Sequence, residues 1–137
     1  MKRSLAALVV VAMIALANTA LAQDWQALAD TETIQVVTKD EFGKPRETTV
    51  WLAVYDGHGY IRTGATRWGK EIQREPDVVV RIAGDEFPLR AAPIGAGDAT
   101  FAAVTDVFRQ KYGFSDAAIG VFRNLGGTPT IMRLDPR

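Results

Sequence analysis

Basic, hydroxyl-bearing and aromatic residues gather in one short stretch of the chain, residues 62–70. Guanidinium, ammonium and hydroxyl groups, together with the backbone N–H groups at the start of a helix, are the groups that bind phosphates and carboxylates in proteins. A tryptophan among them can stack on a planar ring. This stretch is therefore the candidate functional site. Its members are Arg62, Thr63, Gly64, Thr66, Arg67, Trp68 and Lys70.

The same residues also have ordinary structural explanations, which stay open at the level of sequence. The cations Arg62, Arg67 and Lys70 are also explained as solvated charges or as members of surface ion pairs. The acids that lie near them in the sequence are Glu71, Glu75 and Asp77. Trp68 lies four residues before Ile72, on the same face of a helix, and is therefore also explained as a core residue.

The sequence offers little support for other chemistries. It contains no cysteine, which excludes disulfides, thiolate metal sites and cysteine nucleophiles. His58 is the only histidine and lies between two glycines, so we expect a turn residue and no metal site. Ser115 is the only serine after residue 22 and belongs to no nucleophile-elbow motif. Segment 95–99 reads GAGDA, as in sugar kinases, but a loop before a helix capped by Asp98 explains it.

The first 22 residues have the three parts of a secretory signal peptide. Lys2 and Arg3 give a positively charged start, and residues 5–16 form an apolar run that is short for a membrane span. The small residues Ala20 and Ala22 predict cleavage after Ala22. An uncleaved anchor is the alternative. We expect a periplasmic or secreted protein whose mature part is residues 23–137.

That mature part has the length and composition of one globular domain. It would contain 115 of the 137 residues, and the whole chain is 47% hydrophobic and 23% charged. Removing Lys2 and Arg3 with the leader leaves 14 basic and 16 acidic residues, a formal charge of −2. A weakly acidic domain without a basic tail is a poor candidate for binding nucleic acid or an anionic membrane.

Residue periodicity and turn signals predict a mainly β domain with short helices (α+β). Strands are predicted at residues 33–38, 47–55, 60–63, 78–82, 86–91 and 128–134. The strand at 47–55 is apolar on both faces, so we expect it to be central in the sheet. Helices are predicted at residues 24–29, 66–75, 99–112 and 115–123. Thr66 and Asp98 are expected to cap the second and third of these. The Asp56-Gly57 step predicts a hairpin, and the pattern as a whole favours a six-stranded antiparallel barrel.

Three segments of the chain resemble one known family. They are the hairpin TTVWLAVYDGHGYIRTG, the short helix that begins at the RW pair, and the strand segment REPDVVVRIAGDEF. With a long helix that ends at Lys111-Tyr112-Gly113, they are similar to the split β-barrel flavin-binding superfamily. This superfamily includes pyridoxamine-phosphate oxidase-like proteins and deazaflavin-dependent nitroreductases. The resemblance extends over most of residues 33–137 and is nearest to short members of unassigned activity.

The resemblance implies a six-stranded split barrel, a homodimer, and a flavin-type cofactor such as flavin mononucleotide (FMN) at the dimer interface. If the domain is an enzyme, the resemblance implies an oxidoreductase. Carried over position by position, the region that contacts the cofactor and the segment after it correspond to Arg62, Thr63, Gly64, Thr66, Arg67, Trp68 and Lys70.

Two further functions stay open. A noncatalytic binding or interaction module would keep the barrel without the cofactor, because a fold does not determine a function. A hydrolase or transferase would use carboxylates such as Asp56, Asp85 or Asp98. Each of these carboxylates lies at a predicted turn or helix cap, where a structural role is sufficient.

Overall fold

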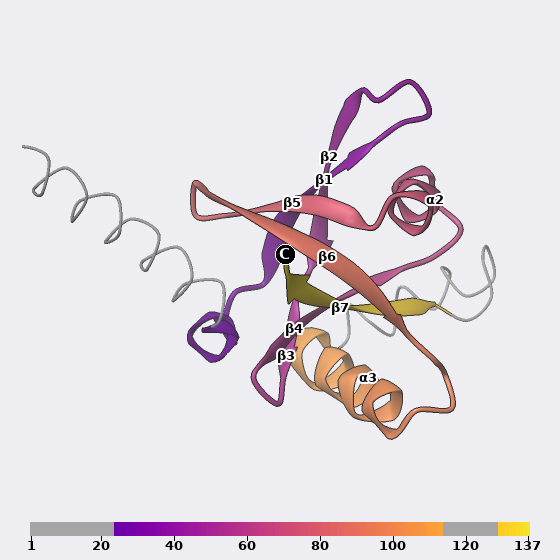
Figure 1. Cartoon of the computed structure of the whole chain (residues 1–137). Helices are drawn as coiled ribbons and strands as arrows, with labels where there is room; N and C mark the ends of the chain where they lie inside the picture. The colour runs from indigo at the N-terminus through magenta and orange to yellow at the C-terminus, as the bar shows by residue number, and fades with distance from the viewer. Residues whose placement is uncertain (1–23, 114–128) are drawn as a thin grey trace, which may run out of the picture.

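The computed structural model describes residues 24–113 and 129–137 (Figure 1). Its elements in chain order are η1 (Trp25–Leu28), β1 (Thr33–Lys39), β2 (Pro45–Trp51), β3 (Ala53–Tyr55), β4 (His58–Thr63), α2 (Arg67–Arg74), β5 (Asp77–Ile82), β6 (Asp85–Ile94), α3 (Ala99–Tyr112) and β7 (Thr130–Pro136). The predicted signal peptide and the predicted helix at 115–123 lie outside the described residues.

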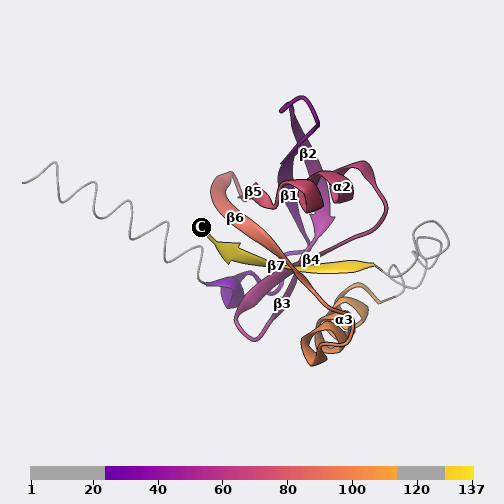
Figure 2. The ribbon, with the colours of Figure 1, turned by 45° about the vertical axis from the view of Figure 1, so that its right-hand side comes forward.

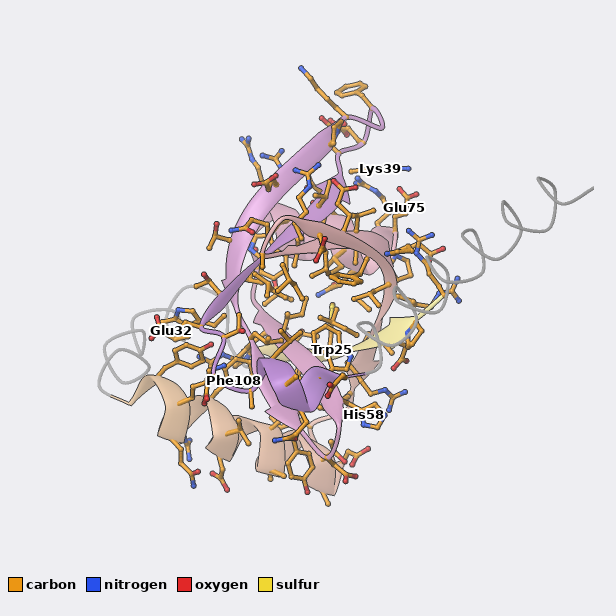
Figure 3. All side chains as sticks on the ribbon, turned by 90° about the vertical axis from the view of Figure 1, so that its left-hand side faces the viewer. Trp25, Glu32, Lys39, His58, Glu75 and Phe108 are labelled. Atoms are coloured by element: carbon orange, nitrogen blue, oxygen red, sulfur yellow. The ribbon has the colours of Figure 1, made fainter. Side chains whose placement is uncertain are left out.

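The strands form a single sheet in the order β2-β1-β5-β6-β7-β4-β3, and every neighbouring pair is antiparallel. The mainly β class with helices is therefore confirmed. Strands β2 and β3 stand at opposite ends of this order, although only Leu52 separates them in the sequence. The sheet must therefore curl until its two ends meet, which produces the half-barrel seen in Figure 3.

The prediction of six strands is wrong by one, because the predicted strand at 47–55 is broken into β2 and β3. The break is at Leu52, whose N–H bonds to the carbonyl oxygen of Glu32 at 3.1 Å and to the Tyr112 hydroxyl at 3.0 Å. The expected central position is also wrong, since among the described strands β2 pairs with β1 alone and β3 pairs with β4 alone. The segment is also not covered on both faces along its length, since Leu52 and Ala53 are buried whereas Glu47, Thr49 and Tyr55 are exposed.

Apolar side chains from the inner face of the curled sheet make the main core. Strand β1 shows the alternation that this requires, with Ile34 and Val36 fully buried and Thr33 and Lys39 exposed. Short helix η1 closes one end of the curl with Trp25, which is 4% exposed (Figure 3). The Trp25 ring lies so close to β4 that a Cβ on Gly59 would come within 2.6 Å of it. Only glycine fits there.

The two α-helices pack at well separated places on the sheet (Figures 1 and 2). Helix α3 covers the β3–β4 side, where Phe108 and Val104 are fully buried against Tyr60. Its predicted N-cap is confirmed, because the Asp98 carboxylate accepts a hydrogen bond from the Thr100 N–H at 2.9 Å. Helix α2 packs beside β1 and leaves directly from the end of β4. The end of β4, the start of α2 and the short segment between them contain all the candidate residues.

Candidate functional site

A two-residue hairpin turn places the end of β4. Asp56 and Gly57 have positive φ angles of 49° and 73°, and Tyr55 pairs with His58 across the turn. This confirms the hairpin predicted from the Asp-Gly step, since such tight turns need left-handed backbone at both positions. The strand that follows, β4, ends at Thr63 and so contributes the first two residues of the candidate stretch, Arg62 and Thr63.

Helix α2 begins where the sequence predicts. The Thr66 hydroxyl accepts a hydrogen bond from the Gly69 N–H at 3.2 Å, and the Lys70 N–H bonds to the Thr66 carbonyl oxygen at 3.0 Å. These two bonds leave the N–H groups of Arg67 and Trp68, the first two helical residues, without partners inside the helix. Such N–H groups are the ones that bind anions at helix starts.

The first turn of α2 rests directly on the end of β4. A Cβ added to Gly69 would lie 2.4 Å from the Gly64 carbonyl oxygen and 2.4 Å from Thr63 Oγ1. Thr63 is 3% exposed, and its hydroxyl donates to the Gly64 carbonyl oxygen at 3.4 Å. Glycine at position 69 is therefore required for this close approach, although it weakens an isolated helix. The structure brings Thr63, Gly64 and Thr66 together at one point.

Two cations of the candidate site, Arg67 and Lys70, are exposed on the first turn of α2. The three acids that lie near them in the sequence bind elsewhere: Glu71 to Arg46, Glu75 to Lys39 and Asp77 to Arg90. Within residues 24–113 and 129–137, neither Arg67 nor Lys70 forms an ion pair, and the first turn contains no acid. The ion-pair explanation is thus wrong for both cations. The positive end of the helix dipole adds to their charge.

Trp68 is half-buried and packs against the main core, as does the fully buried Ile72 one turn later. This is the arrangement that the four-residue spacing predicts for a core residue. The structure therefore places the Trp68 indole at the boundary between the core and the first turn of α2.

Arg62 points to the other side of β4 from Thr63, because successive strand residues face opposite sides of a sheet. Its guanidinium lies 4.7 Å from the ring centroid of Phe108 on α3, a cation–π distance. The side chain of Arg62 is thus not brought beside the start of α2. The sequence already contained the signal for this separation, because Arg62 and Thr63 are consecutive residues of a predicted strand.

A buried polar network behind α2 was missed by sequence reasoning. The Glu71 carboxylate is 6% exposed and accepts hydrogen bonds from Thr38 Oγ1 at 2.8 Å and from Arg46 Nε at 2.9 Å. Burial raises the pKa of Glu71, but the bonds from Arg46 and Thr38 outweigh it, so the pKa lies below its ordinary value. The partners come from β1 and β2, which lie far from Glu71 in the sequence.

A second missed cluster lies at the end of α3. The Tyr112 hydroxyl lies 2.5 Å from the carbonyl oxygen of Glu32 and 2.7 Å from that of Leu52. Its ring stacks on Trp51 at 4.2 Å between centroids. The Lys111 ammonium donates to the Leu52 carbonyl oxygen at 2.8 Å and to the Thr31 carbonyl oxygen. Burial raises the pKa of Tyr112 to about 12 and lowers the pKa of Lys111.

Among the described residues, those considered for other chemistries lie at turns and caps; Ser115 lies outside the described residues. His58 Nδ1 is 2.9 Å from the Asp56 carbonyl oxygen, within an exposed turn. Asp85 begins β6 beside a left-handed Gly84, and Asp98 caps α3. In the part of the chain that the structure describes, no three His, Asp or Glu residues come together as a metal site would require.

None of the described helices has the length and apolar character needed to cross a membrane.

Solved structures with the same fold were found by comparison. HutZ, described as the haem storage protein from Vibrio cholerae, has a TM-score of 0.60 and 14% identity over 77% of this chain and 82% of its own. An FAD-binding protein from Mesorhizobium loti, mll6688, has a TM-score of 0.56 and 10% identity over 82% of this chain and 84% of its own. The F420-H2 dependent reductase FDR-A has a TM-score of 0.57 and 11% identity over 77% of this chain and 95% of its own.

No family model matches the chain, and no curated protein matches it. At the identities of the structural matches, the likeness establishes the fold. The chain folds as a split β-barrel, which confirms the resemblance drawn from its hairpin and strand segments.

Proposed function

We propose that this chain is an exported split-barrel domain that binds a flavin-like or other planar, anionic ligand where β4 meets α2. The observation that carries the proposal is the first turn of α2. It presents the exposed Arg67 and Lys70 with no acid beside them in the turn, and neither has an ion-pair partner in the described residues. Its first N–H groups add donors for an anionic oxygen.

Each part of the junction has a role in this proposal. Arg67, Lys70 and the first amides of α2 hold the anionic group, by charge and by hydrogen bonds. Thr63, Gly64 and Thr66 shape the backbone on which the group rests. Trp68 offers its edge or face to the planar part of the ligand. The guanidinium of Arg62, which lies over Phe108, stays outside this contact set.

The fold adds a second line of support. Solved proteins of this fold include one described as haem-storing and one described as FAD-binding. Both haem and flavin nucleotides combine a planar ring system with anionic groups. FMN is the ligand that we favour, with oxidoreduction as the reaction class if the domain is an enzyme and a homodimer as the assembly.

A thermal melt with added ligand tests the proposal. A ligand that binds only the folded state raises the melting temperature, because binding at about 100 times the Kd adds about 2.7 kcal/mol to the free energy of unfolding. We expect FMN or haem to raise the melting temperature of the mature protein, and uncharged riboflavin to raise it less than FMN. Equal melts with and without FMN and haem would contradict the proposal.

One observation favours a noncatalytic interaction module as the second candidate. Phe42, at the tip of the β1–β2 hairpin, is 87% exposed. The Asp40 carboxylate orders this tip by accepting the N–H groups of Phe42 at 2.9 Å and Lys44 at 2.8 Å. An exposed aromatic side chain on a hydrogen-bonded turn suits contact with another macromolecule. This candidate predicts that Phe42→Ala abolishes a pull-down partner and that FMN and haem leave the melt unchanged.

A further inference from the structure

Helix α2 is joined to the β1–β2 hairpin by one buried carboxylate. Glu71 accepts from Thr38 Oγ1 on β1 and from Arg46 Nε on β2, at 2.8 and 2.9 Å. A buried carboxylate is stable only if it is paired and hydrogen-bonded. Because the two donors belong to two different strands, Glu71 is satisfied only when α2 occupies one position against the hairpin.

The apolar contacts of α2 do not define that position as sharply. A helix of eight residues is marginal by itself, so its placement depends on tertiary contacts. Trp68 and Ile72 attach the helix to the core. Hydrophobic contacts are non-directional and allow a short helix to slide or rotate. Hydrogen bonds have strict distance and angle requirements, so the bonds of Glu71 fix the remaining freedom.

The position of α2 matters because Glu71 lies one helical turn after Arg67. Any rotation of the helix moves the exposed cations and the first N–H groups together. From the β4 side, the contact of Gly69 with Thr63 and Gly64 leaves no room for another atom. The first turn is thus held between a steric contact with β4 and the Glu71 network on the side of the β1–β2 hairpin.

We propose that Glu71 is a positioning residue for the ligand site, which holds α2 where Arg67, Lys70 and the first amides converge on one anionic group. This inference rests on the proposed function. It assigns no contact with the ligand to Glu71 itself.

The chain contains a matched control for this residue. Glu75 also joins α2 to β1, through a contact of 3.9 Å with Lys39, but its side chain and that of Lys39 are 48% and 57% exposed. Exposed ion pairs contribute little to stability. Glu71→Gln and Glu75→Gln remove the same charge, the first from within α2 and the second from its C-cap residue. Removal of a negative charge by itself strengthens the binding of an anionic ligand. A weaker affinity in Glu71→Gln would therefore not be explained by the change of charge.

The test compares the affinity of the wild type, Glu71→Gln and Glu75→Gln for FMN and for haem, at a temperature where all three are folded. We expect Glu71→Gln to weaken binding about tenfold, the effect of losing a hydrogen bond to a charged group. Glu75→Gln should bind as tightly as the wild type or more tightly. An affinity of Glu71→Gln within twofold of that of Glu75→Gln would overturn the inference.

Amide hydrogen exchange of the ligand-free proteins separates this inference from the proposed function. The N–H groups of Gly69 and Lys70, both bonded to Thr66, should exchange faster in Glu71→Gln than in Glu75→Gln. If the wild type binds neither FMN nor haem, the proposed function fails. In that case, equal exchange in the two variants also overturns the role of Glu71 in holding the first turn.

Discussion

The start of α2 and the end of α3 are two places where a helix terminus with basic residues meets the backbone of the sheet. At the end of α3, Lys111 is partly buried and donates to the carbonyl oxygens of Thr31 and Leu52. At the start of α2, Arg67 and Lys70 are exposed, and neither has an ion-pair partner among the described residues. The basic group at the end of α3 is hydrogen-bonded inside the protein, whereas the donors at the start of α2 are free to meet a ligand.

This difference assigns different roles to the two termini. The end of α3 binds the backbone at Leu52, where the chain passes from one edge of the curled sheet to the other. The end of α3 therefore holds the half-barrel closed and stabilises the fold. At the start of α2, the exposed cations Arg67 and Lys70 form no ion pair among the described residues, and in our proposal they bind a ligand. We accordingly expect variants at the end of α3 to change the free energy of unfolding, and variants of the cations of α2 to change the affinity for the ligand.

The largest expected effect is on stability, from Tyr112→Ala. The substitution removes the ring stacked on Trp51 and the hydroxyl that is hydrogen-bonded to the N–H and carbonyl groups of Leu52. We expect the free energy of unfolding to fall by about 3 kcal/mol, as for other large-to-small substitutions of packed aromatic residues. Urea denaturation measures this loss. Tyr55→Ala, at a side chain that is 37% exposed, is the control and should change stability little. A comparable loss in both variants would contradict the role given to the end of α3.

Gly69→Ala should act at the other terminus. Alanine normally stabilises a helix relative to glycine. Here the added Cβ would meet backbone at 2.4 Å, so we expect a loss of about 1–3 kcal/mol instead. Thermal or urea unfolding measures the change. Gly97→Ala adds a Cβ with no atom within 4 Å and should be close to neutral. A stabilised Gly69→Ala protein would show that α2 is not held against β4.

These two sites also show what the sequence does and does not predict. The Asp56-Gly57 hairpin and the Thr66 and Asp98 caps depend on residues within a few positions, and local patterns found all three. The strand break at Leu52 depends on Tyr112, and the burial of Glu71 depends on Arg46. No local pattern contains such long-range partners.

The local structure of the candidate stretch was predicted better than the directions of its side chains. The helix start at Thr66 and the exposure of Arg67 follow from capping and periodicity. Arg62 was grouped with Thr63 because they are adjacent in the sequence. Adjacent residues in a strand face opposite sides, and the Arg62 guanidinium lies over Phe108.

The double variant Arg67→Ala/Lys70→Ala should leave stability within about 0.5 kcal/mol, since both side chains are exposed. Its affinity for FMN or haem should fall about tenfold or more, because two charged contacts with the anionic group are lost. Isothermal titration measures the affinity. Arg109→Ala, at an exposed cation of α3, is the charge control and should bind as the wild type does. Equal affinities in the two variants would place the ligand away from α2.

The smallest expected effect is a difference in the pH dependence of stability. The folded-state pKa of Tyr112 is raised by burial from 10.0 to about 12. A raised pKa contributes stability that is present below pH 10 and is lost as the pH rises toward about 12. Lys111, whose pKa is lowered by burial, acts in the opposite direction as the pH approaches 10.5. Tyr112→Phe should therefore lose less stability than the wild type between pH 10 and 12. Parallel curves would contradict the burial of the hydroxyl.

The central claim is that a planar, anionic ligand binds where β4 meets α2, and the visible absorbance spectrum of the purified protein tests it most directly. We predict a band that stays with the protein through gel filtration, at about 450 nm for a flavin or at the Soret position for haem. The band should be restored by reconstitution with the same ligand and weakened in Arg67→Ala/Lys70→Ala. A colourless protein that also remains colourless after incubation with FMN and with haem would contradict the account.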